Sequence, residues 1–182
     1  NIKKKNRANT RDTKVFVMTG GQVVGTDEIL SLGAEGLVLK PIMAATIMDI
    51  VRRTTLSKER YWQVQPTTKP TLEVKRVFTT LDEALRTTLS FGRGGFAFLE
   101  KLEQVNVDDL IEFHFSFSNG TGNGTGNGTT LKGSGYVRWI RGTGGSQTPA
   151  TGIEIAYMDT KSREIFIDWV KKNEPTSFIP AA

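Results

Sequence analysis

The segment SFGRGG, from Ser90 to Gly95, holds the residues best suited to bind a ligand. Gly92, Gly94 and Gly95 let a backbone approach a bound molecule closely. Arg93, between them, carries a planar guanidinium that can hold a phosphate group with two parallel hydrogen bonds. The alternative for Arg93 is an exposed turn residue. Two further arginines precede the segment, and a solvated surface position is the favoured interpretation for both: Arg76 and Arg86.

Other kinds of site find little support in the sequence. The chain has no cysteine and one histidine, His114, which argues against thiolate and histidine metal sites and against a Ser-His triad. The carboxylates are scattered singly, and Glu100, Glu103, Asp108 and Asp109 are interpreted as a solvated turn. We therefore expect no catalytic residue, no metal and no tightly held cofactor.

The positive charge is concentrated at the start of the chain. The first fourteen residues hold six basic residues and one acidic residue, which accounts for the whole net charge of +5. Such a run could bind phosphates, but it lacks interleaved aromatic residues, so a solvated helix end or loop is the simpler interpretation.

The totals are those of a globular chain. With 182 residues, 37% hydrophobic and 24% charged, we expect one domain or two small ones. No apolar run is long enough to span a membrane and no signal peptide opens the chain, so the cytoplasm is the expected location. Because the first residue is Asn1, we expect a fragment of a longer protein.

The first third of the sequence alternates strands and helices. Val15–Gly21 and Gly36–Pro41 are short apolar runs typical of buried parallel strands. Thr26 is a candidate N-cap, with acidic residues after it in the first turn of a helix that Gly33 ends. Ala44–Arg53 predicts a second helix, with Ile47, Ile50 and Val51 on one face. This order predicts an α/β unit with a parallel sheet.

VFVMTG followed by SLGAEGLVLKPI (Ser31–Ile42) resembles the C-terminal half of a response-regulator receiver domain. The resemblance implies that Thr19 and Lys40 are the switch residues at two adjacent strand ends, where a hydroxyl and an ammonium can reach one anionic group. It also implies a cis peptide bond before Pro41. Lys40 as a plain strand-end residue is the alternative.

The family's acidic pocket and phosphoacceptor Asp have no counterpart in this chain. NIKKK (Asn1–Lys5) looks like the tail of the helix that precedes this half, so the sequence carries no phosphorylation site of the family. Half of such a sheet leaves an unpaired strand edge and an uncovered apolar face. We therefore expect upstream residues or another chain to complete it, with a homo-oligomer as one outcome.

The remainder predicts a linker and a β-rich domain. Residues 55–71 have weak periodicity and two prolines, so the predicted domains are 1–54 and 72–182. In DLIEFHFSFS the apolar residues alternate strictly with polar ones, which places His114 on the solvent-facing side of the strand. Tyr136–Arg141 and Gly152–Met158 alternate in the same way, and helical spacing then predicts a last helix that ends before Pro175. Trp139 and Trp169 are interpreted as core residues.

Residues Asn119 to Thr130 repeat a four-residue unit, NGTGNGTGNGTT, with three glycosylation sequons. No secretory signal accompanies the sequons, and the absence of carboxylates excludes a calcium-binding repeat. Since the repeat joins two predicted strands, it is interpreted as the flexible tip of a β-hairpin.

The run from about Leu72 to Trp169 resembles a PilZ domain, the bacterial receptor module for cyclic di-GMP. The resemblance rests on SFGRGGFAFLE (Ser90–Glu100), the turn at Val107–Asp109, the V-R-W strand, TGIEIAYMD and the closing helix. It implies a six-stranded antiparallel barrel with a C-terminal helix, and such domains are often fused to receivers. The fold class is therefore α+β, with a partial α/β unit before the barrel.

Both ligand motifs of the family are altered. In the D/N-x-S-x-x-G motif, Ser90 stands at the Asp or Asn position and Gly92 at the Ser position. The arm before the barrel has no RxxxR; the only literal match, Arg7–Arg11, lies in the receiver-like part and is interpreted as chance. Arginines could still bind the phosphates and guanines of the ligand.

Two hypotheses follow. The first is a bacterial signalling output protein whose degenerate PilZ-like domain is a non-enzymatic interaction module that has lost its ligand. The second is a cyclic di-GMP receptor with an altered site at Arg76, Arg86, Ser90 and Gly92–Gly95. Both imply a two-component or related signal-transduction role, and neither requires DNA or a membrane. Cyclic di-GMP binding distinguishes them.

Overall fold

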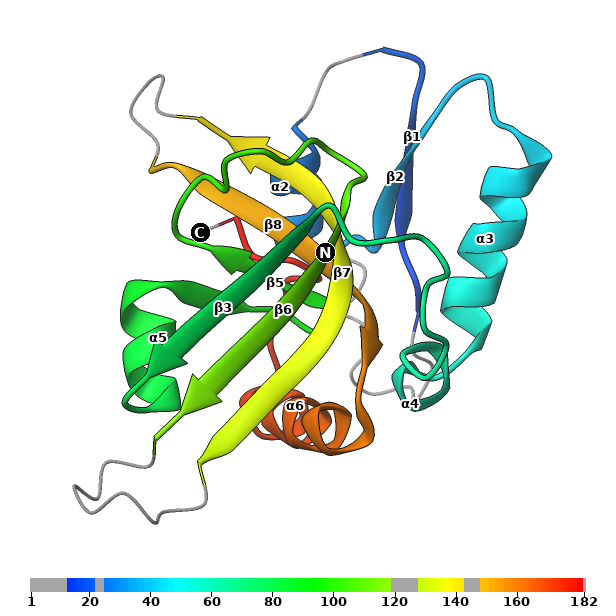
Figure 1. Ribbon diagram of the computed structural model, residues 1–182. Coiled ribbons are helices and arrows are strands. Elements are labelled where there is room, and N and C mark those ends of the chain that lie inside the picture. The colour runs from blue at the N-terminus through cyan, green and yellow to red at the C-terminus, as the bar shows by residue number, and fades with distance from the viewer. Residues whose placement is uncertain (1–12, 22–24, 119–127, 143–147, 182) are drawn as a thin grey trace.

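The structure, a computed structural model, describes residues 13–21, 25–118, 128–142 and 148–181. Two sheets dominate it, a small one near the N-terminus and a large curled one (Figure 1). The basic run among the first residues lies almost wholly outside the described residues, as do RANTR and NIKKK.

The N-terminal unit confirms the predicted order of strands and helices. β1 (Phe16–Thr19) and β2 (Gly36–Leu39) pair in parallel, and α2 (Thr26–Ser31) connects them. Gly33 has φ +95°, the left-handed conformation expected of a helix stop. Thr26 begins the helix and Gly25 is the cap residue, so the predicted Thr26 cap is wrong by one position, although the acids of the first turn are in place. α3 (Ala44–Thr55) follows.

The large sheet has six strands in the order β3-β6-β7-β8-β5-β4. Its bounds are β3 Leu72–Phe78, β4 Leu89–Phe91, β5 Gly95–Phe98, β6 Leu110–Phe117, β7 Thr129–Arg141 and β8 Ala150–Met158. The sheet curls into a half-barrel and ends at β3 and β4.

The expectation that every strand pair is antiparallel is wrong for β3, which runs parallel to β6. Between these two strands the chain forms α5 (Leu81–Thr87) and the β4–β5 hairpin, which lies at the opposite edge of the sheet. The chain then returns to begin β6 beside the start of β3. A crossover of this length permits parallel pairing, whereas a tight turn would enforce antiparallel pairing.

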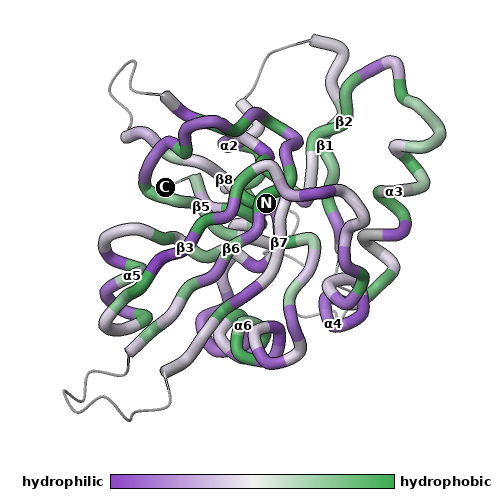
Figure 2. The backbone as a smooth tube through the Cα atoms, viewed as in Figure 1, coloured by the Kyte–Doolittle hydropathy of each residue, from purple (hydrophilic) through white to green (hydrophobic). Residues whose placement is uncertain are grey.

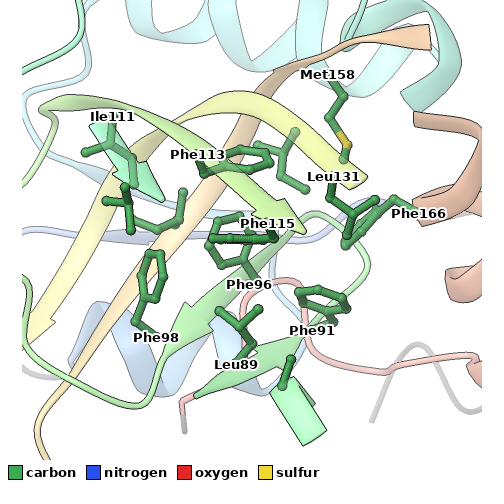
Figure 3. Close-up of a cluster of buried hydrophobic side chains, with 14 of the residues drawn as sticks. Leu89, Phe91, Phe96, Phe98, Ile111, Phe113, Phe115, Leu131, Met158 and Phe166 are labelled. Carbon is green, nitrogen blue, oxygen red and sulfur yellow. The ribbon is translucent and has the colours of Figure 1, made fainter. Parts of the chain in front are cut away.

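Aromatic residues fill the concave side of the sheet. Phe113, Phe115 and Phe117 of β6 are at most 2% exposed, which confirms the predicted alternation. Phe96 of β5 packs edge-on against Phe113 at 5.0 Å between ring centroids, and Figure 3 shows these rings converging. His114 points the other way and is half-buried. Edge-to-face pairs add to the stability that burial alone supplies.

Helix α6 (Thr160–Asn173) closes the open side of the sheet and ends before Pro175, as predicted. Asp159 caps it by accepting a hydrogen bond from the Ser162 N–H at 2.8 Å. The predicted core positions of Trp139 and Trp169 are confirmed, since Trp139 is 5% exposed and Trp169 packs on the core.

The segment predicted as a linker contributes to the core. It contains α4 (Lys58–Tyr61), and Trp62 directly after it is 1% exposed. The Trp62 ring contacts Phe166 of α6 at 5.6 Å, and its carbonyl accepts a hydrogen bond from the Met158 N–H. The contacts of Trp62 therefore hold residues 55–71, including α4, against the large sheet and α6.

The glycine–asparagine–threonine repeat connects β6 to β7. These strands are antiparallel neighbours, with Phe117 opposite Thr129, which agrees with a hairpin. Residues 119–127 of the repeat lie outside the described residues. Across the part of the chain that is described, no helix is both long and apolar enough to cross a membrane.

Candidate functional site

The glycine loop between β4 and β5 packs against the C-terminal segment of the chain. The backbone N–H groups of Arg93 and Gly94 donate to the carbonyls of Ser177 and Phe178, each at 3.0 Å. A Cβ on Gly92 would collide with the Phe178 carbonyl, and one on Gly94 with the Phe178 ring. The close approach that these glycines allow is therefore used by the chain itself, and the donors that would cradle an anion are already engaged.

The side chain of Arg93 binds the N-terminal unit. Its Nη1 lies 2.6 Å from Oε1 of Glu35, a carboxylate that is only 3% exposed, and its Nη2 donates to the Gly33 carbonyl. Its guanidinium also lies over the Phe178 ring, 5.3 Å from the centroid. Arg93 is 17% exposed, so it is not an exposed turn residue. It joins the glycine loop to the segment between α2 and β2.

The other arginines predicted for the site lie elsewhere. Arg76 is on β3, at the far edge of the sheet, and forms an ion pair with Glu100 at 2.7 Å. Arg86 is exposed in the last turn of α5. Ser90 is half-buried on β4, next to the loop. Within the described ranges, no hydrogen bond or ion pair joins Arg76 or Arg86 to the loop residues.

Thr19 is the last residue of β1 and Lys40 directly follows β2, so both lie at the ends of two adjacent parallel strands, as expected. The Lys40 N–H donates to the Thr19 carbonyl at 2.9 Å, and the peptide bond between Lys40 and Pro41 is cis. The Thr19 hydroxyl donates to the Gly21 carbonyl at 2.6 Å, while the Lys40 side chain is exposed. Both side chains can therefore donate to one anion only if the Thr19 hydroxyl gives up its hydrogen bond to the Gly21 carbonyl.

A cavity of about 460 Å³ lies beside the glycine loop, between α4 and α6. This volume is in the range of small-molecule sites. Basic side chains surround its rim, and apolar side chains of the two helices and of the connection to α4 form its walls. The basic residues are Lys14, Lys58, Arg93 and Lys171, and the apolar ones are Leu56, Trp62, Ile167 and Val170.

Lys58 is the least expected member of this cavity. Its Nζ lies 4.6 Å from the centroid of the Phe178 ring and 5.8 Å from that of Trp62. Burial lowers the pKa of Lys58 to about 8, although the carboxylates of Glu154 and Glu35 act in the opposite direction. The sequence offered one signal for this pair: Lys58 and Trp62 are four residues apart, which places them on one face of a helical turn.

An ion-pair network crosses the outer face of β7 and β8. Arg138 contacts Glu154 at 2.7 Å and Asp108 at 2.7 Å. These two carboxylates raise the pKa of Arg138 despite its burial. Glu154 is buried and Asp108 is exposed, so the arginine neutralises a carboxylate that water cannot reach.

No cluster of three metal-ligating side chains occurs within the described ranges. No family model, curated protein or solved structure matches this chain.

Proposed function

We propose that the chain is a bacterial signalling output protein in which a degenerate PilZ-like domain and a partial receiver-like unit act as a non-enzymatic protein-interaction module. The observation that carries this proposal is an uncovered apolar surface on the N-terminal unit.

This surface, here called the α3 stripe, consists of Ala44, Ile47, Met48 and Val51. The four residues follow the i, i+3, i+4, i+7 spacing with which an amphipathic helix faces a partner. All are exposed, Met48 by 67% and Val51 by 45%. Met43 continues the stripe at the start of the helix, and Figure 2 shows apolar residues along α3 and the two strands.

Clustered exposed apolar residues are typical of sites that bind another protein. Methionine suits such a surface because its flexible side chain adapts to a partner. The occupied glycine loop supports the same proposal, since its backbone donors hold residues 177 and 178 rather than a ligand.

Site-specific photo-crosslinking tests this function. A photoreactive residue at Met48, in the full chain in living bacteria, is expected to give a discrete adduct with one protein or with a second copy. The matched control is Val77 on β3, which is 79% exposed and apolar but lies outside the α3 stripe. Adducts at both positions, or at neither, would contradict an interface at α3.

A cyclic di-GMP receptor with an altered motif is the second candidate. Its support is that Arg93 borders a cavity with three lysines. Calorimetric titration with cyclic di-GMP is expected to give no heat if the interaction module is right. Micromolar binding that Arg93→Ala removes, with the fold of the variant verified by circular dichroism, would establish the receptor instead.

A further inference from the structure

The ammonium of Lys58 borders the cavity, and the carboxylates of Glu154 and Glu35 act on it only through space. Among the described residues it makes no hydrogen bond and no ion pair, and its contacts are the faces of two aromatic rings. Such contacts favour a cation but leave its three N–H donors without acceptors. Lys58 is half-buried and lines the cavity, so acceptors for these donors must come from what the cavity holds.

A second polar group in the same wall also lacks a partner. The indole N–H of Trp62 is buried, and no acceptor lies within hydrogen-bonding distance of it in the described part of the chain. Trp62 lines the cavity together with Lys58. Buried donors without acceptors are rare in folded proteins, so the Trp62 N–H, in the same cavity lining as the Lys58 ammonium, indicates a missing acceptor.

The charges around the cavity favour an anion. Four basic side chains line it against one acidic side chain, Glu59. Glu35, behind the wall, pairs with Arg93 at 2.6 Å and Lys14 at 3.6 Å and so offsets one of these charges. Even with Glu35 counted, the positive groups outnumber the negative ones by two.

We propose that this cavity binds a small organic anion, with one phosphate or carboxylate group that pairs with Lys58 and an apolar body that lies against Trp62, Ile167 and Val170. This assignment is independent of the interaction surface on α3. A lysine suits a compact anionic group of either kind, because its ammonium is a point charge without the fixed fork of an arginine.

Phenyl phosphate is the probe for this site, because it joins one anionic group to one ring. Benzyl alcohol supplies the ring without the charge, and inorganic phosphate supplies the charge without the ring. In NMR titrations of the full chain, phenyl phosphate is expected to shift the Trp62 indole signal and the amides of residues 55–59. Its affinity should exceed that of either control by about tenfold or more, as a charge-assisted hydrogen bond implies.

Lys58→Met removes the charge and keeps the apolar stem, so phenyl phosphate should then lose most of its advantage over benzyl alcohol. Lys161→Met, an exposed lysine on α6 outside the cavity, should retain the preference. Met48→Glu on α3 should retain it too, which separates this site from the proposed interface. Equal affinities for phenyl phosphate and benzyl alcohol in the native chain, or unchanged binding in Lys58→Met, would overturn the proposal.

Affinity should also depend on pH, because only protonated Lys58 pairs with the anion. Since burial lowers the pKa of Lys58 to about 8, phenyl phosphate should bind more weakly as the pH rises above that value. The charged groups around Lys58 are Glu154, Glu35, Lys14 and Arg93, with Glu59 and Lys171 at the cavity rim. An affinity that stays constant from pH 7 to pH 9 would contradict the role of Lys58.

Discussion

Arg93 lies where the sequence predicts a ligand, yet its guanidinium contacts another part of the chain. Its partner, Glu35, is 58 residues away and is nearly inaccessible to water. Loss of one member of such a pair leaves a buried charge that is less well compensated, which is costly. At the scale of the residue, the same chemistry that could bind phosphate here binds a carboxylate of the protein.

Arg93→Met should therefore lower the free energy of unfolding by about 3 kcal/mol. Glu35 would keep its longer ion pair with Lys14, at 3.6 Å. Urea denaturation of the single variants and of Arg93→Met with Glu35→Gln measures the effect. The double variant should lose less than the sum of the two single losses, and strictly additive losses would show that the pair is not coupled.

Lys58→Met should have the opposite effect on stability. Because burial lowers the pKa of Lys58 from 10.5 to about 8, the folded state holds its proton less tightly than the unfolded chain does. The charged form therefore destabilises the fold below pH 8, and this penalty disappears as the pH rises from 8 to 10.5.

At pH 7 the free energy of unfolding of Lys58→Met is expected to exceed that of the native chain by up to about 3 kcal/mol. This figure converts the pKa shift at 1.36 kcal/mol per pKa unit. Urea denaturation at pH 7 and pH 10 gives the comparison, and the gain should be much smaller at pH 10. A variant as stable as the native chain at pH 7 would show that the ammonium carries no penalty.

At the scale of the element, the glycine loop and the C-terminal segment form one packed unit. The loop donates two backbone hydrogen bonds to residues 177 and 178, and the Phe178 N–H donates to the Leu30 carbonyl of α2. Phe178 and Ile179 are buried in a small cluster with Leu30 and Trp139. The segment thus fills the space between α2 and the large sheet.

Gly94→Ala should displace this segment, since its Cβ would overlap the Phe178 ring. Overpacking of this kind costs about 1–3 kcal/mol. Hydrogen exchange should accelerate at the amides of Arg93, Gly94 and Phe178 while the β6 amides stay protected. Gly142→Ala, where an added Cβ meets no atom, is the control. Protection unchanged in both variants would show that the segment tolerates the methyl group.

Most elements were predictable because their signals are local. In the Phe-rich strand β6, the alternation of apolar and polar residues predicted the buried face. In α6, the helical spacing of the apolar residues predicted the apolar face. The direction of β3 was not predictable, because LEVKRVF places the same residues inward whether its neighbour runs parallel or antiparallel. The path of the chain through α5 and the β4–β5 hairpin determines the direction of β3 relative to β6.

At the scale of the whole molecule, the candidate site is made by contacts between distant segments. The sequence identified Arg93 but not Glu35, since nothing local links residues 58 positions apart. It placed Lys58 and Trp62 in a linker, and only the packing of α4 against α6 makes them part of a cavity. The sequence placed Ile47 and Val51 of α3 on one face with Ile50, whereas the exposed α3 stripe combines them with Ala44 and Met48.

The hydrogen bond from Phe178 to Leu30 joins residues that are made at very different times during synthesis. The N-terminal unit is synthesised well before residues 176–179, by roughly 6 to 24 seconds at ordinary elongation rates. Throughout that interval Leu30, which is 2% exposed in the finished fold, lacks its contacts with Phe178 and Ile179. The nascent N-terminal unit therefore keeps the side chain of Leu30 open to solvent until the last residues of this sequence have been added.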